Sequence, residues 1–389
     1  MDVGRILNIR ELLKKKSFFL FGPRSTGKST LAEAQLAGEA LLIDLLDGTT
    51  YLRLVADPSA LEQMIGLPGN EHKIVIIDEI QKIPALLDQI HRLIEKKHRR
   101  FLMTGSSARK LRAGAANLLA GRAWAAQLFP LVYAEIPKPD LMRILRYGTL
   151  PQVYFSDDPE EELAAYSQTY LREEIQTEGL VRKIPQFSRF LKVAALCNGQ
   201  TINYSSVGSD CGVAASTVRE YFSILEDTLI GFTVEPWMSS RKRKAIQTAK
   251  FYLFDTGVTH MLAGTETLDR NSDLFGKSFE QWIAMELRAY VSYRRLKVSL
   301  LFWRSTSGHE VDFLIGNALA IEVKSTTKVV AQDLRGLRAL AEESVFSTLI
   351  CVSHDKIDRN VDGILCYHWQ TFVTKLWGDE LFPAREGGG

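Results

Sequence analysis

The chain has 389 residues, of which 46% are hydrophobic and 24% charged, a composition typical of globular proteins with two or three domains. Its formal net charge of +2 excludes a globally basic nucleic-acid-binding surface, so any DNA contact must come from local basic patches. The four cysteines include no CxxC pair, which argues against a zinc site and a disulfide framework, and no secretory or membrane-spanning apolar segment is recognisable. These features favour a cytoplasmic protein without a membrane partner.

The first motif is a phosphate-binding loop. Residues 17–30 read SFFLFGPRSTGKST, an apolar run followed by G-x-x-x-x-G-K-S and the start of a helical segment. In such a loop the glycines let backbone N–H groups face phosphate oxygens, Lys28 reaches the β and γ phosphates, and Ser29 ligates Mg²⁺. The predicted ATP site consists of Gly22, Pro23, Arg24, Ser25, Thr26, Gly27, Lys28, Ser29 and Thr30.

A second apolar run, KIVIIDEI at residues 73–80, ends in two acids. We expect Asp78 to hold Mg²⁺ through water and Glu79 to polarise the attacking water. Further strands are predicted at residues 41–45, 101–107 and near 127–135. The predicted fold is a doubly wound α/β P-loop domain with a parallel sheet and its ligand at the carboxyl ends of the strands.

Three polar residues near these strands are open to two interpretations each. Thr104 and Ser106 lie at the end of the strand expected at 101–107 and could sense the γ-phosphate, although such residues more often form turns. Arg122, in LLAGRAW, could act as an arginine finger on a neighbouring subunit or form a salt bridge. The finger would make activity depend on an oligomer.

The motifs GPRSTGKST, IIDEIQ, LMTGSSARKL and LAGR occur in this order. Together they resemble a large prokaryotic group of AAA-superfamily ATPases that carry a C-terminal domain of unknown function. The resemblance covers residues 15–135 and implies an ATPase domain over residues 1–135. It also suggests a homo-oligomer, for which a hexameric ring is one candidate.

Residues 136–182 are expected to form a helical connector with an amphipathic helix at 166–175. Residues 183–265 resemble a winged helix, because a short helix, a turn at 211–213 and a longer helix precede two expected wing strands. A helix-turn-helix that joins domains or binds protein is the alternative. Four consecutive basic residues between the wing strands suit phosphate contacts or form a solvated loop. The candidate DNA-binding residues are Ser216, Thr217, Arg219, Arg241, Lys242, Arg243 and Lys244.

Residues 308–328, GHEVDFLIGNALAIEVKSTTK, read as a β-hairpin. If Val311, Phe313 and Ile315 share a face with the apolar residues of the second strand, the loop must have an odd number of residues, and the shortest such loop is 316–318. That register places Asp312 opposite Glu322, with Lys324 on the same face. Carboxylates paired across two strands repel one another, and a bridging Mg²⁺ would hold them together. Solvated surface charge is the alternative.

The hairpin resembles the PD-(D/E)XK nucleases, with Val311 where the proline is usual. The resemblance implies that Asp312, Glu322 and the helix residue Glu280 bind Mg²⁺ or Mn²⁺, and that Lys324 positions or activates water. Residues 266–389 would then form a nuclease-like α/β domain. The Glu280 helix is expected over residues 274–290.

Three functions remain open from the sequence. The leading hypothesis is an ATP-hydrolysing DNA-processing protein, with an AAA-type motor coupled to a metal-dependent endonuclease acting on branched DNA or recombination intermediates. The second is a nucleotide switch whose winged helix and nuclease-like fold bind a partner. The third, a defence or transcription factor with sequence-specific binding, is disfavoured by the single basic residue on the expected reading helix.

Overall fold

The computed structural model describes residues 3–107, 121–170, 181, 184–240 and 242–382. These residues form two compact units, which are described separately below. The first unit comprises residues 1–131 and 224–230, and the second comprises residues 132–223 and 231–389. Among the described residues, no helix is long and apolar enough to cross a membrane.

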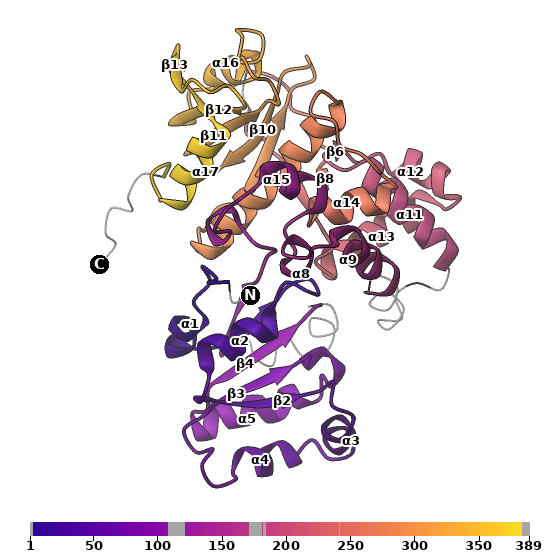
Figure 1. The fold of residues 1–389 in the computed structure, drawn as a ribbon, viewed down its shortest axis with the longest axis vertical. Helices are drawn as coiled ribbons and strands as arrows, with labels where there is room; N and C mark the ends of the chain where they lie inside the picture. Colours follow the sequence, from indigo (N-terminus) through magenta and orange to yellow (C-terminus); the bar gives the residue numbers. More distant parts are fainter. Residues whose placement is uncertain (1–2, 108–120, 171–180, 182–183, 241, 383–389) are drawn as a thin grey trace. The chain divides into compact units, whose positions relative to one another are not determined.

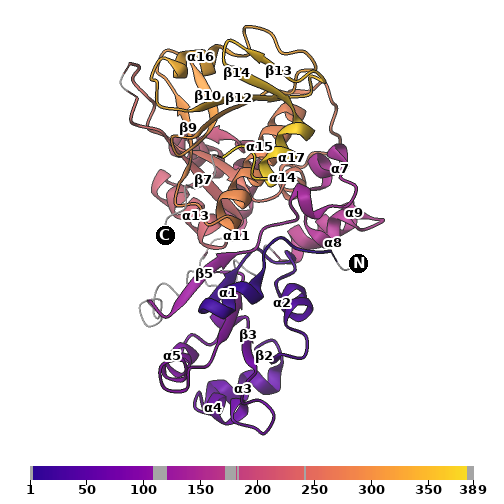
Figure 2. The same cartoon turned by 90° about the vertical axis from the view of Figure 1, so that its left-hand side faces the viewer.

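The first unit alternates strands and helices along most of its length (Figures 1 and 2). Its strands are parallel and are ordered β2-β3-β4-β1-β5, and α2 and α5 lie on opposite sides of the sheet. The elements are α1 (Ile9–Lys15), β1 (Ser17–Phe21), α2 (Lys28–Leu36), β2 (Ala40–Asp44), α3 (Gly48–Ala56), α4 (Ala60–Ile65), β3 (Ile74–Asp78), the 3₁₀ helix η1 (Ile80–Lys82), α5 (Leu86–Lys97), β4 (Phe101–Gly105) and β5 (Ala123–Gln127).

The parallel α/β sheet predicted from the sequence is confirmed, including the strands at 41–45, 73–80 and 101–107. The prediction of a strand at residues 127–135 is wrong, because the fifth strand ends at Gln127. Leu128 N makes a last bond to Phe21 O at 2.7 Å, and Pro130, two residues later, has no N–H to continue a ladder. The alanine-rich sequence of β5, AWAAQ, gave a weak strand signal.

The second unit begins with short helices and continues into a helical segment with a small sheet. The elements are η2 (Tyr133–Glu135), α7 (Leu141–Tyr147), α8 (Pro151–Tyr154), α9 (Pro159–Ala165), the π-helix η3 (Tyr166–Tyr170), α11 (Ile184–Leu196), β6 (Gln200–Thr201), α12 (Tyr204–Cys211), α13 (Ala215–Asp227), β7 (Gly231–Pro236), β8 (Lys250–Leu253) and α14 (Thr256–Ala263). The four C-terminal residues of α13 belong to the first unit. Within the expected amphipathic helix at 166–175, residues 171–175 lie outside the described part of the chain.

The C-terminal part of this unit consists of α15 (Asp273–Tyr293), β9 (Leu300–Arg304), β10 (Glu310–Ile315), β11 (Leu319–Val323), α16 (Arg335–Ala341), β12 (Thr348–Ser353), β13 (Arg359–Val361), β14 (Ile364–His368) and α17 (Trp369–Trp377). Its strands and β6–β8 form one nine-stranded sheet, ordered β13-β14-β12-β11-β10-β9-β7-β8-β6. The join is a parallel pairing of β7 with β9. Residue 265, the expected domain boundary, therefore does not separate two sheets.

The predicted hairpin register is confirmed, because Ile315 pairs with Leu319 and Phe313 with Ile321. The prediction that Val311 shares a face with Phe313 is wrong. The pairing of β10 with β9 shifts between Val311 and Leu314, and Val311 packs in the same apolar cluster as Leu314. A bulge of this kind turns one residue to the other face of the sheet. Asp312, inside this irregular stretch, contacts Lys250, which also contacts Glu280 of α15.

Candidate functional sites

The ATP-site candidates lie at one edge of the first sheet. In a parallel sheet all carboxyl ends meet at the same edge. The phosphate-binding loop follows β1, Asp78 ends β3, and Thr104 lies near the end of β4, the strand between them. The strand order thus brings together three segments that are far apart in the sequence.

The loop has the close packing and unusual backbone of a phosphate cradle. A Cβ at Gly22 would lie 2.4 Å from Leu128 O, and Gly27 has φ of +88°, so both positions favour glycine. The Lys28 ammonium is buried and donates to Gly22 O at 2.8 Å and to Pro23 O at 3.1 Å. Lys28 therefore lies along the inner side of the loop that would hold the phosphates.

The candidate Mg²⁺ ligands touch one another. Ser29 Oγ donates to Asp78 Oδ2 at 2.8 Å, and Thr104 Oγ1 donates to Asp78 Oδ1. A hydroxyl next to a carboxylate oxygen is the donor set that Mg²⁺ uses in phosphate-binding sites. The residues present therefore fit Mg²⁺ bound with a nucleotide. The contact of Thr104 with Asp78 gives Thr104 a place inside this site.

Glu79 adopts a backbone conformation that is rare for a glutamate, with φ of +59°. Its amide donates to Thr104 Oγ1 at 3.3 Å, and its Oε2 accepts from Gln81 Nε2. Gln81 Nε2 also donates to Ser106 Oγ at 3.3 Å. Residues held at positive φ cluster at functional sites, where the surrounding bonds maintain the strain. Glu79 is thus oriented by Gln81 and Thr104, and Ser106 belongs to the same network.

Arg5 was not recognised from the sequence. Its guanidinium donates to Thr26 O at 2.7 Å and to Phe129 O at 2.6 Å, which ties the phosphate-binding loop to the segment after β5. A lone arginine before the first strand carries no pattern that identifies such a role.

Arg122 forms an ion pair with Glu95 at 2.5 Å. It immediately precedes β5, whose first residue pairs with Ser17 at the start of β1. Arg122 therefore lies at the amino edge of the sheet, away from the phosphate-binding loop of its own subunit. The arginine-finger role on another subunit stays a prediction.

The DNA-binding candidates on α13 are accessible. Ser216 and Arg219 are exposed, Thr217 is half-buried, and Val218 points into the core. The Arg219 guanidinium lies 4.1 Å from the centre of the Tyr204 ring. A stacked arginine keeps its charge while its orientation is fixed.

The basic run between β7 and β8 is only partly accessible. Arg243 donates to Ala339 O at 2.9 Å and pairs with Glu342 at 3.0 Å, which occupies the side chain predicted to contact phosphate. Lys242 and Lys244 are exposed. Arg241 lies outside the described residues.

The nuclease-like candidates on the hairpin lie close together. Asp312 and Glu322 are both buried, and Asp312 Oδ2 accepts from Val323 N at 2.9 Å, which places its carboxylate beside the strand that carries Glu322. Glu322 Oε1 pairs with the Lys324 ammonium at 2.5 Å. Burial, followed by the negative charge of Asp312, raises the pKa of Glu322 well above its ordinary value. Glu280 reaches the cluster from α15.

A lysine that the sequence did not reveal lies inside this cluster. The Lys250 ammonium contacts Glu310 Oε1 at 2.7 Å, Glu280 Oε1 at 3.1 Å and Asp312 Oδ1 at 3.4 Å. Among the residues that the structure describes, no group of three His, Cys, Asp or Glu side chains could hold a metal ion. The residues as arranged therefore do not fit the predicted Mg²⁺ or Mn²⁺ centre, because a protein cation already pairs with the acids.

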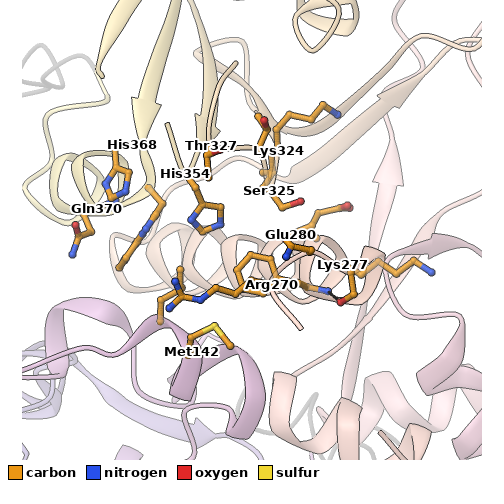
Figure 3. Close-up of a pocket in the computed structure, with 18 of the residues that line it drawn as sticks. Met142, Arg270, Lys277, Glu280, Lys324, Ser325, Thr327, His354, His368 and Gln370 are labelled. Carbon is orange, nitrogen blue, oxygen red and sulfur yellow. Dashed lines mark hydrogen bonds between the residues drawn. The ribbon is translucent and has the colours of Figure 1, made fainter. Parts of the chain in front are cut away.

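A pocket of about 1060 Å³ borders the cluster through Glu280 and Lys324 (Figure 3). Its other walls come from residues 139–142, from the segment that begins α15, and from the residues that follow β11, β12 and β14. Lys277 and Arg270 contribute positive charge from the α15 side, and Lys356 contributes it from the segment after β12. The pocket thus combines positive side chains with one acid of the cluster.

Comparisons with known proteins identify the first domain. Residues 14–137 match the AAA domain family, while residues 138–269 and 275–371 match two domains of unknown function, DUF8612 and DUF4143. The uncharacterized proteins Rv2008c of Mycobacterium tuberculosis and Mb2031c of Mycobacterium bovis are each 28% identical over 341 residues, covering 84% of this chain and 74% of their own. Residues 14–137, which carry the phosphate-binding loop and the acidic strand, are thus similar to an AAA domain.

Among solved structures, Aeropyrum pernix ORC1 in complex with DNA aligns over 66% of this chain and 91% of its own. The sequence identity is 14% and the TM-score is 0.28.

Proposed function

We propose that this protein binds and hydrolyses Mg²⁺-ATP in its AAA-superfamily domain and uses the nucleotide cycle to act on DNA. The observation that carries the ATPase part is the network of Ser29, Asp78, Thr104 and Glu79. It links the phosphate-binding loop to the end of β3 through the hydrogen bonds described above. Lys28 and the loop backbone hold the phosphates.

In this mechanism Ser29 and Asp78 hold Mg²⁺, which supplies positive charge against the phosphates when it is bound. Glu79 accepts a proton from the attacking water, and Gln81 orients its carboxylate. Thr104 holds the Asp78 carboxylate and the Glu79 backbone in position through its hydrogen bonds to both. Such a general base contributes roughly 10²–10⁴-fold to the rate.

The DNA part of the proposal is supported by the arrangement of residues 183–265. Along the chain α11, β6, α12, α13, β7 and β8 follow one another, and β6 and β7 each pair antiparallel with β8, an order expected of a winged helix. The exposed Ser216, Arg219, Lys242 and Lys244 would contact DNA. The sparse positive charge favours contacts to phosphates over base readout.

The nuclease hypothesis is supported only by the buried Asp312 and Glu322, by the Lys324–Glu322 ion pair and by Glu280 on α15. Because Lys250 pairs with these acids, we favour a binding or regulatory role for the nuclease-like part of the chain. Cleavage of single-stranded, duplex or four-way-junction DNA by the wild type, lost in Glu322→Ala, would restore the nuclease hypothesis.

The proposal is tested by measuring the rate of ATP hydrolysis without DNA and with single-stranded, duplex or four-way-junction DNA. We expect a basal rate that DNA stimulates, and no hydrolysis by Lys28→Ala. Binding to DNA should weaken in Lys242→Glu/Lys244→Glu, whereas Lys14→Glu/Lys15→Glu on α1 provides a control of equal charge change. Hydrolysis that no DNA alters would contradict the DNA part, and absence of hydrolysis would contradict the ATPase part.

A further inference from the structure

The second unit contains a buried lysine that neither the ATP site nor the proposed DNA interface uses. Lys250 begins β8, the middle strand between β6 and β7, and only 3% of the residue is exposed. A buried ammonium is costly unless charged or hydrogen-bonding groups surround it. The surroundings of Lys250 should therefore explain why it is there.

The ammonium meets three carboxylates, which matches its three N–H donors. One carboxylate, Glu280, comes from α15, and the other two, Glu310 and Asp312, come from β10. Tyr252, two residues further along β8, also donates to Glu280 Oε1 at 2.6 Å. A single strand thus supplies the positive charge and an additional donor that hold acids from two other elements together.

The same carboxylates are those that a divalent cation would need. Glu280 and Asp312 are two of the predicted ligands, and Mg²⁺ binds oxygen at about 2.0–2.1 Å. An ion bound to both would occupy the space between their oxygens, where the Lys250 ammonium lies. Two cations that close would repel strongly in a buried site. The ammonium and a metal ion therefore cannot both pair with these acids.

Glu322 shows that Lys250 does not satisfy the whole cluster. Its Oε1 pairs with Lys324, but its buried Oε2 has no hydrogen-bond partner among the residues that the structure describes. A buried carboxylate oxygen without a partner is destabilising. Glu322 Oε2 is therefore an oxygen that a metal ion replacing Lys250 could bind.

We propose that Lys250 and a divalent cation compete for this one carboxylate cluster, so that the site excludes metal while Lys250 is in place and accepts metal when Lys250 is removed. The proposal concerns the second unit alone and stands whether or not the AAA domain hydrolyses ATP.

The test is a Mn²⁺ titration of the full chain without nucleotide, followed by electron paramagnetic resonance. Lys250→Met removes the charge at similar length, and Lys250→Arg keeps it as the matched control. We expect Lys250→Met to bind Mn²⁺ at least tenfold more tightly than the wild type and Lys250→Arg. Adding Asp312→Asn to Lys250→Met should abolish this binding. The melting temperature of Lys250→Met should also rise with Mn²⁺, and that of the wild type should not.

Two results would overturn the competition. One is a folded Lys250→Met protein that binds no Mn²⁺. The other is wild-type protein that binds Mn²⁺ as tightly as Lys250→Met, or binds it tightly and loses that binding in Glu322→Gln. The wild-type measurement requires no folded Lys250 variant, and Lys250→Gln, which retains a hydrogen-bond donor, is measured in parallel.

Discussion

Glu286 on α15 gives the stability of the second unit a specific dependence on pH. It is buried, and its carboxylate accepts from Tyr133 N at 2.8 Å, Trp282 Nε1 at 3.1 Å and Trp377 Nε1 at 2.6 Å. Burial raises the pKa of Glu286 by more than these hydrogen bonds lower it. Together with the nearby negative charge of Glu135, burial brings this pKa from 4.5 to about 8. The folded protein therefore keeps this proton at pH values where the unfolded chain has lost it.

The contribution of Glu286 to stability is complete below about pH 4.5 and is lost as pH rises through about 8. Within that window the free energy of unfolding falls by about 1.4 kcal/mol per pH unit because of this group. The shift from 4.5 to about 8 corresponds to a total of about 5 kcal/mol. Glu286→Gln removes the titrating group, but the glutamine side chain has a single acceptor oxygen. One indole N–H would lose its acceptor, which should lower the free energy of unfolding by about 1–3 kcal/mol.

The assay is urea unfolding at pH 5, 6, 7 and 8, followed by tryptophan fluorescence. Of the six tryptophans only Trp124 lies in the first unit, so the signal reports mainly on the second. We expect Glu286→Gln to be less stable than the wild type at pH 5, with the difference shrinking or reversing by pH 8. Glu161→Gln, at an exposed glutamate of α9, controls for the loss of one carboxyl group. If the free energy of unfolding changes with pH in parallel for wild type and Glu286→Gln, Glu286 does not have the raised pKa on which this prediction depends.

Two further predictions concern positions that the sequence did not single out. Arg5→Ala removes two charge-assisted bonds to the phosphate-binding loop and the segment after β5, and we expect it to raise the Kd for ATP about tenfold by calorimetry, equivalent to about 1.4 kcal/mol. The exposed Arg10→Ala should leave that Kd unchanged. Gly336→Ala places a Cβ 1.8 Å from Glu310 O, so it should lower the free energy of unfolding by about 1–3 kcal/mol in urea titrations, whereas Gly48→Ala, with open space at its Cβ, should not.

The sequence was informative where one local pattern determines the structure. The phosphate-binding loop, the acidic strand and the hairpin register all follow from the spacing of apolar and glycine residues within a few positions, and the strands and register are confirmed. The fifth strand was misplaced because alanines give β5 little strand propensity and an apolar run containing Pro130 follows it. Val311 was assigned to the wrong face because alternation does not reveal a bulge.

Long-range pairings could not be predicted in the same way. Lys250 lies 62 residues before Asp312, in a stretch that reads only as an apolar strand with one charge at its start. Arg5 contacts Phe129 across an interval of 124 residues. Asp255 also makes a long-range contact, because its buried carboxylate accepts from Thr149 N at 2.8 Å. Burial raises the pKa of Asp255 to about 6. Each of these contacts depends on how elements pack, which the periodicity of one segment does not encode.

We propose that Glu79, held at positive φ beside Thr104 and Gln81, acts as the general base in ATP hydrolysis. The most direct measurement compares ATP binding and phosphate release for wild type and Glu79→Gln at saturating Mg²⁺-ATP. The account predicts unchanged nucleotide affinity and a turnover reduced by roughly 10²-fold or more, since a general base contributes about 10²–10⁴-fold. Phosphate release by Glu79→Gln at the wild-type rate would contradict it.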